Sequence, residues 1–127
     1  PQDAWLQLSV VIPVYNEADN LAHLYERLQK TLAAHYTGYE IIFVNDGSTD
    51  TSMAEILKLA ALDPSVRYID LSRNFGHQCA IAAGLRFCVG KAVVVMDADL
   101  QDPPELIGEM QQRMNEGWDV VYARRRQ

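Results

Sequence analysis

Hydrophobic residues along the chain fall into two alternating patterns. Short apolar runs rich in β-branched residues predict strands at 8–14, 40–45, 66–72, 92–96 and 119–123. Between them, apolar residues recur at helical spacing and predict helices at 20–36, 52–62, 77–89 and from Pro103 to about Gly117. The run 92–96 is the most continuously apolar, so we expect it to be a central strand covered on both faces. The half-alternating run 66–72 is expected nearer an edge.

Proline and glycine mark several of the predicted boundaries. Pro13 interrupts the first strand near its end, and Asp63-Pro64 closes the second helix. Gly90 follows the third helix and is predicted to be its C-cap. Pro103 stands at a position that favours the first turn of the fourth helix.

The predicted order is strand then helix, repeated four times, and then a last strand. Right-handed crossovers make this order an α/β fold with a mostly parallel sheet and helices on both faces. A length of 127 residues fits a single domain, 1–127. Ligands of such sheets bind beyond the carboxyl ends of the strands, and polar residues follow the four strand ends at Val14, Val44, Leu71 and Met96.

Composition excludes several classes of protein. With 49% hydrophobic and 22% charged residues, the chain suits a packed core rather than a disordered state. A net charge of −6 argues against a nucleic-acid partner, which normally meets a basic face. The two cysteines lack metal-ligand spacing and indicate reduced thiols in a cytosolic compartment. No apolar run approaches the ~20 residues that span a bilayer, so this stretch of chain is expected to be soluble.

The strongest chemical signal is Asp97-Ala98-Asp99, directly after the run 92–96. Two carboxylates at i and i+2 can face one Mg²⁺ or Mn²⁺ ion and leave open positions for diphosphate oxygens. Gln101 continues the same spacing with a carbonyl oxygen. The alternative is a pair of exposed turn aspartates ahead of a helix, and the spacing alone does not decide between the two.

Polar residues after the first two strands are candidates for nucleotide binding. Asp46 can accept a hydrogen bond from a nucleobase, or it can belong to an Asx turn in which Ser48, Asp50 or Thr51 caps the next helix. Tyr15 can flank a base and ribose, or it can simply pack at the strand end.

The loop after the third strand offers a cation and a hydrogen-bonding amide. Arg73 can hold a phosphate or a carboxylate of the site, and Asn74 can bond a sugar or the backbone. His77 begins the next helix and is expected to cap it rather than to bind metal. The chain contains no Gly-x-Gly-x-x-Gly, Walker or Ser-His-Asp pattern, which removes support for dinucleotide oxidoreductases and P-loop hydrolases.

Four stretches together resemble glycosyltransferase family 2: SVVIPVYNE, EIIFVNDGSTD, LSRNFGHQCAIAAGL and VVVMDADLQDPPE, in this order. The SRNFG and DLQDPPE segments resemble most closely the branch of polyprenyl-phosphate glycosyltransferases, which includes dolichyl-phosphate mannose synthases and bactoprenol glucosyltransferases. The resemblance runs from residue 8 to about residue 125 and implies the Rossmann-like glycosyltransferase-A fold.

The resemblance also implies roles for individual residues. Contacts with the donor nucleotide are implied for Pro13, Tyr15, Glu17, Asp46, Asp97 and Arg125. Ligands of the Mg²⁺ or Mn²⁺ ion are implied at Asp97, Asp99 and Gln101. Many family members carry two aspartates where this chain has Asn45-Asp46, so recognition of the base is left to Asp46 alone.

The implied reaction is inverting transfer of a sugar from a UDP- or GDP-sugar to an undecaprenyl or dolichyl phosphate. Asp99, Asp102 and Arg73 are the candidate catalytic residues. An anionic acceptor oxygen needs no dedicated general base, and Asp102 is the remaining candidate for one. A non-catalytic nucleotide-binding module of the same fold and a nucleotidyltransferase are the alternatives.

Relatives continue past the fifth strand with an acceptor-binding segment, amphipathic helices and often transmembrane helices. We therefore expect the chain to be a C-terminally truncated catalytic domain that binds nucleotide but turns over poorly. The full-length protein is expected on the cytoplasmic face of the inner membrane, held there by segments missing from this chain, and a homo-oligomer remains open.

Overall fold

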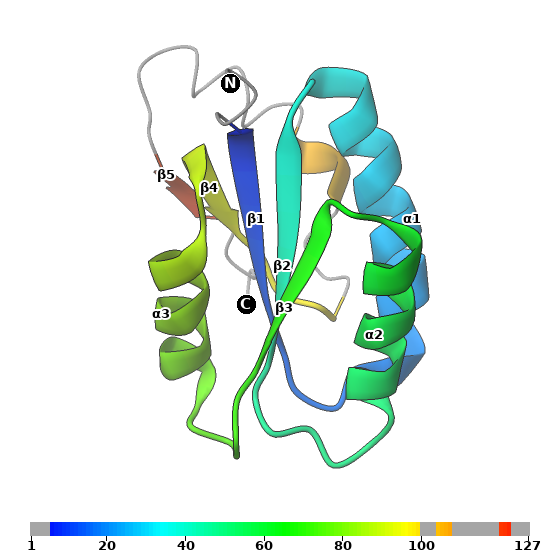
Figure 1. Ribbon diagram of the computed structural model, residues 1–127, viewed down its shortest axis with the longest axis vertical. Coiled ribbons are helices and arrows are strands. Elements are labelled where there is room, and N and C mark those ends of the chain that lie inside the picture. Colours follow the sequence, from blue (N-terminus) through cyan, green and yellow to red (C-terminus); the bar gives the residue numbers. More distant parts are fainter. Residues whose placement is uncertain (1–5, 100–103, 108–119, 123–127) are drawn as a thin grey trace.

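The computed structural model describes residues 6–99, 104–107 and 120–122, which form one parallel sheet between two layers of helices (Figure 1). The strands are β1 (Leu6–Val14), β2 (Tyr39–Asn45), β3 (Val66–Asp70), β4 (Gly90–Val95) and β5 (Val120–Tyr122). Their order is β3-β2-β1-β4-β5, and every neighbouring pair is parallel. The predicted sheet is confirmed, with β3 at an edge as expected.

Helices cover both faces of this sheet. Helices α1 (Ala18–His35) and α2 (Ser52–Leu62) lie on one face, and α3 (His77–Phe87) lies on the other (Figure 1). The leucine stripe predicted for the first helix is the buried side of α1: Leu21, Leu24, Leu28 and Leu32. No described helix is long and apolar enough to cross a membrane.

Alternate residues of the strands supply two separate hydrophobic cores. Val10 and Ile12 of β1 pack in the core beneath α1 and α2, whereas Val11 between them packs beneath α3. Because side chains alternate across a strand, a sheet covered on both faces needs apolar residues at every position. This requirement explains the continuous apolar runs in the sequence.

β1 extends further along β2 than along β4, and this difference opens the sheet at its carboxyl end. Pairing with β2 continues to Val14 opposite Asn45, but pairing with β4 ends at Val11 opposite Val95. Pro13 lies in this last part of β1, where it pairs with β2 but no longer with β4. Its missing N–H therefore leaves the β1–β4 ladder intact.

The C-cap prediction for Gly90 is wrong. Helix α3 ends at Phe87 with Cys88 in an extended conformation, and Gly90 is the first residue of β4. A Cβ atom on Gly90 would lie 2.6 Å from the backbone nitrogen of Ser9, so close approach of two strands is what requires glycine there. Of the helix predicted from Pro103, the described part is the 3₁₀-helix η2 (Pro104–Leu106), and the rest lies outside the described residues.

A buried carboxylate fixes the amino-terminal end of the sheet. Glu40 is 2% exposed, and its Oε2 accepts hydrogen bonds from the Ser9 hydroxyl at 2.6 Å and the Val89 N–H at 2.8 Å. The guanidinium of Arg67 pairs with Oε1. These partners offset the desolvation of the charge and tie the α3–β4 connection to β1 and β2.

Helix η2 is attached to α1 by an ion pair. Arg27 donates two hydrogen bonds to the Glu105 carboxylate, from Nε at 3.0 Å and from Nη2 at 2.5 Å. Hydrogen bonding from Arg27 lowers the pKa of Glu105. With Ile107 fully buried in the core beneath α1, this contact places the end of the loop that follows β4.

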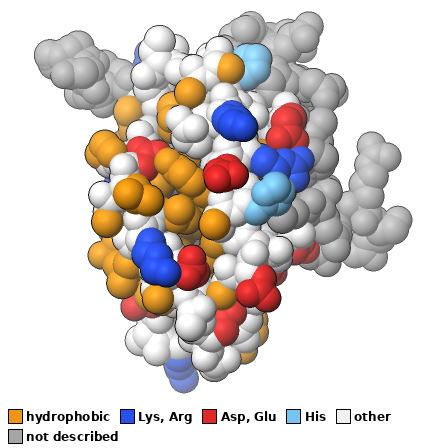
Figure 2. Space-filling model, turned by 90° about the vertical axis from the view of Figure 1, so that its right-hand side faces the viewer, with side chains coloured by type: hydrophobic (Ala, Val, Ile, Leu, Met, Phe, Trp, Pro, Cys, Tyr) orange, Lys and Arg blue, Asp and Glu red, His pale blue; other side chains and the backbone are white. Residues whose placement is uncertain are grey.

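The outer side of α1 and α2 is unevenly divided between polar and apolar side chains. Figure 2 shows hydrophobic side chains gathered toward one edge of this face, with charged side chains of both signs over the rest. Large exposed hydrophobic residues of α2 and the edge strand β3 are Leu57, Leu62 and Tyr68.

Helix α3 approaches the sheet so closely that it tolerates only glycine at position 84. A Cβ atom there would lie 2.3 Å from Cγ1 of Val11, a fully buried side chain with no room to move. We expect Gly84→Ala to lower the free energy of unfolding by about 1–3 kcal/mol, measured by urea denaturation. Ala82→Ser, at an exposed position of the same helix, should change it little; equal effects would contradict this packing argument.

Candidate active site

Asn16 joins the loops that follow β1 and β2. Its Oδ1 accepts hydrogen bonds from the backbone N–H groups of Thr49 at 2.7 Å and Asp50 at 3.3 Å. In return, its own N–H donates to the Ser48 hydroxyl at 2.9 Å. Asn16 has a φ of 54°, a left-handed conformation that asparagine adopts more readily than most residues. Sequence analysis missed this role, although Asn between Tyr15 and Glu17 is a common turn former.

Asp50 caps two helices at once. Its Oδ1 accepts the N–H of Ser52 at 2.8 Å at the start of α2, and its Oδ2 accepts the N–H of Ala18 at 3.3 Å at the start of α1. Hydrogen bonding from Ser52 is the main cause of a lowered pKa for Asp50. The capping prediction is confirmed for Asp50, whereas Thr51 makes no side-chain capping bond.

Asp46 connects β2 to the start of α3. The residue is 4% exposed, and its two carboxylate oxygens accept the backbone N–H groups of Phe75 at 2.8 Å and Gly76 at 3.1 Å. A negative charge at this position also interacts favourably with the amino end of α3. Base recognition by Asp46 stays a prediction, and a base would share a carboxylate that already accepts two hydrogen bonds.

The loops after β2 and β3 touch through their backbones. A Cβ atom on Gly47, which has a φ of 70°, would lie 2.2 Å from the backbone nitrogen of Asn74. Asn74 Nδ2 donates to the Asp46 carbonyl at 3.1 Å, so Asn74 bonds the backbone, one of its two predicted roles. Gly47 therefore permits the approach that the Asp46 hydrogen bonds require.

Asn45 pairs with an aspartate that sequence analysis did not single out. Its Nδ2 donates to Asp70 Oδ1 at 3.0 Å, and its Oδ1 accepts the Ser48 N–H at 3.4 Å. The pairing of β2 with β3 places Asn45 opposite Asp70. An aspartate at position 45 would put two carboxylates against each other, which gives a physical reason for the amide in this chain.

Arg73 and Phe75 form an exposed pair at the carboxyl end of the sheet. The Arg73 guanidinium carbon lies 4.7 Å from the centroid of the Phe75 ring, a cation–π contact. Phe75 is 44% exposed, so the pair faces solvent. Arg73 is exposed and therefore accessible to an anion.

The predicted nucleotide residues of the first loop differ in accessibility. Tyr15 is 48% exposed, whereas Pro13 is buried within β1. Glu17 is the N-cap residue of α1, and its Oε1 accepts a hydrogen bond from Asn20 Nδ2 at 2.8 Å. Of the three, Tyr15 is the most exposed and the most accessible to a ligand.

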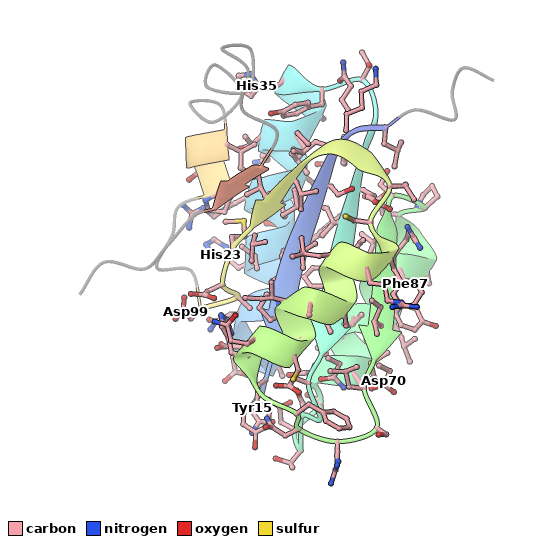
Figure 3. All side chains as sticks on the ribbon, turned by 90° about the vertical axis from the view of Figure 1, so that its left-hand side faces the viewer. Tyr15, His23, His35, Asp70, Phe87 and Asp99 are labelled. Carbon is pink, nitrogen blue, oxygen red and sulfur yellow. The ribbon has the colours of Figure 1, made fainter. Side chains whose placement is uncertain are left out.

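Asp97 and Asp99 follow the end of β4, where β1 no longer pairs with β4. The Asp97 side chain is 24% exposed, and its Oδ1 lies 3.5 Å from Nε2 of His77. His77 is the first residue of α3 and Gly76 is the N-cap, so the prediction that His77 caps the helix is wrong. In Figure 3, Tyr15 lies toward the lower end of the view, Asp99 lies nearer mid-height, and His35 lies at the upper end.

The donor set suits a hard divalent cation. Two partly exposed carboxylates are oxygen ligands of the kind that Mg²⁺ and Mn²⁺ prefer. Within the described part of the chain, no group of three or more His, Cys, Asp or Glu side chains is placed to hold a metal ion. Remaining positions would therefore go to a diphosphate, to water or to other residues. Gln101, Asp102 and Arg125 lie outside the described residues.

Replacing Gly47 tests the contact between the two loops. We expect Gly47→Ala to cost more than about 2 kcal/mol in free energy of unfolding, because it adds a backbone clash to the strain of a positive φ. Gly76→Ala is the matched control: Gly76 has a φ of 104° but open space around a Cβ atom, so only strain of about 1–3 kcal/mol applies. Urea denaturation of both variants measures the difference, and a smaller loss for Gly47→Ala would refute the clash.

Asn45→Asp should destabilise the fold in a pH-dependent way. The introduced carboxyl group faces Asp70, which raises its folded pKa above its unfolded value. The loss, about 1–2 kcal/mol, is therefore complete above the folded pKa and disappears as pH falls below the unfolded pKa of ~3.9. Urea denaturation between about pH 3 and pH 8 measures the loss on both sides of these pKa values. The double variant Asn45→Asp/Asp70→Asn restores a donor–acceptor pair; an equal loss there would exclude charge repulsion.

Comparison with known proteins identifies the family of the chain. Residues 9–127 match the family model described as Glycosyl transferase family 2. The chain is 51% identical over 118 residues to the uncharacterized glycosyltransferase YkcC of Bacillus subtilis (strain 168), covering 93% of the chain and 36% of that relative. It is 46% identical over 116 residues to an undecaprenyl-phosphate 4-deoxy-4-formamido-L-arabinose transferase of Edwardsiella ictaluri (strain 93-146), covering 90% and 35%. The chain thus spans about a third of the length of these relatives.

Solved structures support the same assignment. A mannosyltransferase from Pyrobaculum calidifontis in complex with GDP-Man and Mn²⁺ matches with a TM-score of 0.67 and 25% identity, covering 73% of this chain and 27% of that one. S. aureus TarS 1–349 in complex with UDP-GlcNAc matches with a TM-score of 0.71 and 23% identity, covering 87% and 32%, a likeness of fold. With the family model matching nearly the whole sequence, the chain belongs to glycosyltransferase family 2.

Proposed function

We propose that the protein containing this chain transfers a sugar from a UDP- or GDP-sugar to a polyprenyl phosphate, with Mg²⁺ or Mn²⁺ at Asp97 and Asp99. The observation that carries the proposal is the position of these carboxylates. They follow β4 where it separates from β1, which is the point at which strand order reverses in the sheet. Parallel α/β sheets bind ligands at such switch points.

The named relatives favour particular substrates. The mannosyltransferase structure contains GDP-Man and Mn²⁺, which supports a nucleotide-sugar donor and a divalent ion for this chain. The Edwardsiella ictaluri relative is named for an undecaprenyl-phosphate acceptor, which supports a lipid phosphate here. Titration with UDP and with GDP distinguishes the two possible donor nucleotides.

The residues proposed for the metal and the nucleoside have separate tasks. Asp97 and Asp99 bind the metal–diphosphate group, with Gln101 as a further oxygen ligand. Tyr15 flanks the nucleoside. A bound divalent ion would neutralise charge on the departing diphosphate.

The remaining candidate residues are proposed to contact the base, the phosphates or the nucleoside. Asp46 contacts the base while holding the α3 loop, and Arg73 attracts a phosphate without leaving the Phe75 ring. Glu17 and Pro13 shape the nucleoside site from the strand end and the start of α1. Arg125 is proposed as a further phosphate contact.

The proposed transfer is an inverting displacement. A phosphate oxygen of the acceptor attacks the anomeric carbon, and the bond from that carbon to the diphosphate breaks with its electron pair leaving on the nucleoside diphosphate. The attacking oxygen is already anionic, so no proton has to be removed and Asp102 is needed only if an acceptor hydroxyl is used. Association with a membrane is proposed through segments outside these 127 residues.

Calorimetric titration of the purified chain with UDP, GDP and their common sugar conjugates, with and without Mn²⁺, tests the donor site. We expect one nucleotide to bind, with its affinity raised by Mn²⁺. Asp99→Asn keeps the shape of the side chain but removes its charge, and it should abolish the effect of Mn²⁺ because a carboxylate ligand is lost.

Glu26→Gln, at an exposed position of α1, is the charge-matched control and should behave as wild type. Absence of any Mn²⁺-dependent binding, or an unchanged Mn²⁺ effect in Asp99→Asn, would contradict the proposed donor site. Binding without sugar transfer by a longer protein would instead favour a nucleotide-binding module.

A further inference from the structure

His77 lies beside Asp97, a proposed metal ligand. The proposed function gives His77 no role. It is the first residue of α3, on the opposite side of the sheet from α1 and α2. Its Nε2 lies 3.5 Å from Oδ1 of Asp97, and the two side chains are 51% and 24% exposed. The contact therefore joins helix α3 to the loop after β4.

The backbone beneath His77 is held by several independent contacts. The preceding Gly76 donates its N–H to Asp46 and, with a φ of 104°, turns the chain into the helix. The first helical hydrogen bond runs from Ala80 N–H to the Gly76 carbonyl at 3.1 Å. Gly84 then brings the helix against Val11. His77 consequently projects from a fixed support, whereas Asp97 lies in a loop outside β4.

We propose that His77 is a positioning residue: its Nε2–H holds Oδ1 of Asp97 so that Oδ2 is presented to the metal–diphosphate group. This inference rests on the proposed function. A separation of 3.5 Å exceeds an ordinary N–H···O hydrogen bond, and such contacts commonly shorten when a ligand binds. Hydrogen-bond partners of ligating carboxylates set ligand orientation, and their loss typically lowers metal affinity about 10–100-fold.

Direct ligation by the imidazole is a different prediction. It would require Nε2 to be unprotonated and turned from Asp97 toward the ion, whereas positioning requires only an N–H donor at that place. Glutamine offers such a donor in its Nε2–H₂ group, at a similar distance from the backbone. His77→Gln keeps a hydrogen-bond donor but also carries a carbonyl oxygen that can ligate Mg²⁺ or Mn²⁺. Direct ligation is therefore tested in the wild-type chain, where an imidazole nitrogen bound to Mn²⁺ would give a nitrogen hyperfine coupling and a positioning contact would not.

The test is titration of Mn²⁺ into the purified chain at a saturating concentration of the nucleoside diphosphate that binds wild type, followed by electron paramagnetic resonance of free Mn²⁺. We expect about 10–100-fold weaker Mn²⁺ binding in His77→Ala, and a change of less than about threefold in His77→Gln. His35→Ala is the matched control, since His35 lies at the opposite end of the molecule (Figure 3). Nucleotide affinity without metal should be the same in all four proteins.

Each outcome has one meaning. Wild-type Mn²⁺ affinity in His77→Ala, with the loss in Asp99→Asn still observed, would overturn the positioning role and leave the donor site standing. Equal losses in His77→Ala and His77→Gln, or a nitrogen hyperfine coupling to bound Mn²⁺ in wild type that His77→Ala removes, would overturn it in favour of direct ligation. If Asp99→Asn also binds Mn²⁺ as wild type does, the donor site itself fails. Far-ultraviolet circular dichroism and urea midpoints of the variants exclude misfolding as the cause.

Discussion

The hydrogen bonds of the Asp46 carboxylate are the interaction on which the carboxyl end of the sheet depends. A carboxylate that is 4% exposed is tolerated only when its charge is satisfied, and Asp46 achieves this by accepting the N–H groups of Phe75 and Gly76. The same bonds decide where the β3–α3 loop lies and where α3 begins. Arg73 precedes the two bonded residues and His77 follows them, so the Asp46 side chain also fixes where these two residues lie.

Negative charge is distributed unequally along this edge of the sheet. At the β2–β3 side, Asn45 supplies a neutral donor to Asp70, and backbone donors together with the amino end of α3 compensate Asp46. At the β4 side, Asp97 and Asp99 remain partly exposed, with His77 near Asp97. Partly exposed carboxylates therefore lie where β1 and β4 separate, at the switch point of the sheet.

Contacts between separate elements hold the loops near this opening and the far end of the sheet. Asn16 and Asp50 bind the loops after β1 and β2 to each other, and the Arg27–Glu105 ion pair attaches η2 to α1. At the far end of the sheet, the buried Glu40 network secures the connection between α3 and β4. The membership of the chain in glycosyltransferase family 2 agrees with this arrangement, in which a fixed frame presents a few carboxylates at a switch point.

The sequence by itself determined the order of the elements, the parallel sheet and the strand ends that carry polar residues. These follow from local periodicity, because each apolar run records which faces of its own strand or helix are covered. Tertiary structure alone decided the partners of Asp46, Asn45, Glu40 and His77, and it corrected the role of Gly90. The long-range contacts of these four residues join positions at least 20 apart, as for His77 with Asp97, and the role of Gly90 depends on how closely two backbones approach. The local sequence pattern does not predict such long-range contacts, because strand register and helix packing determine them.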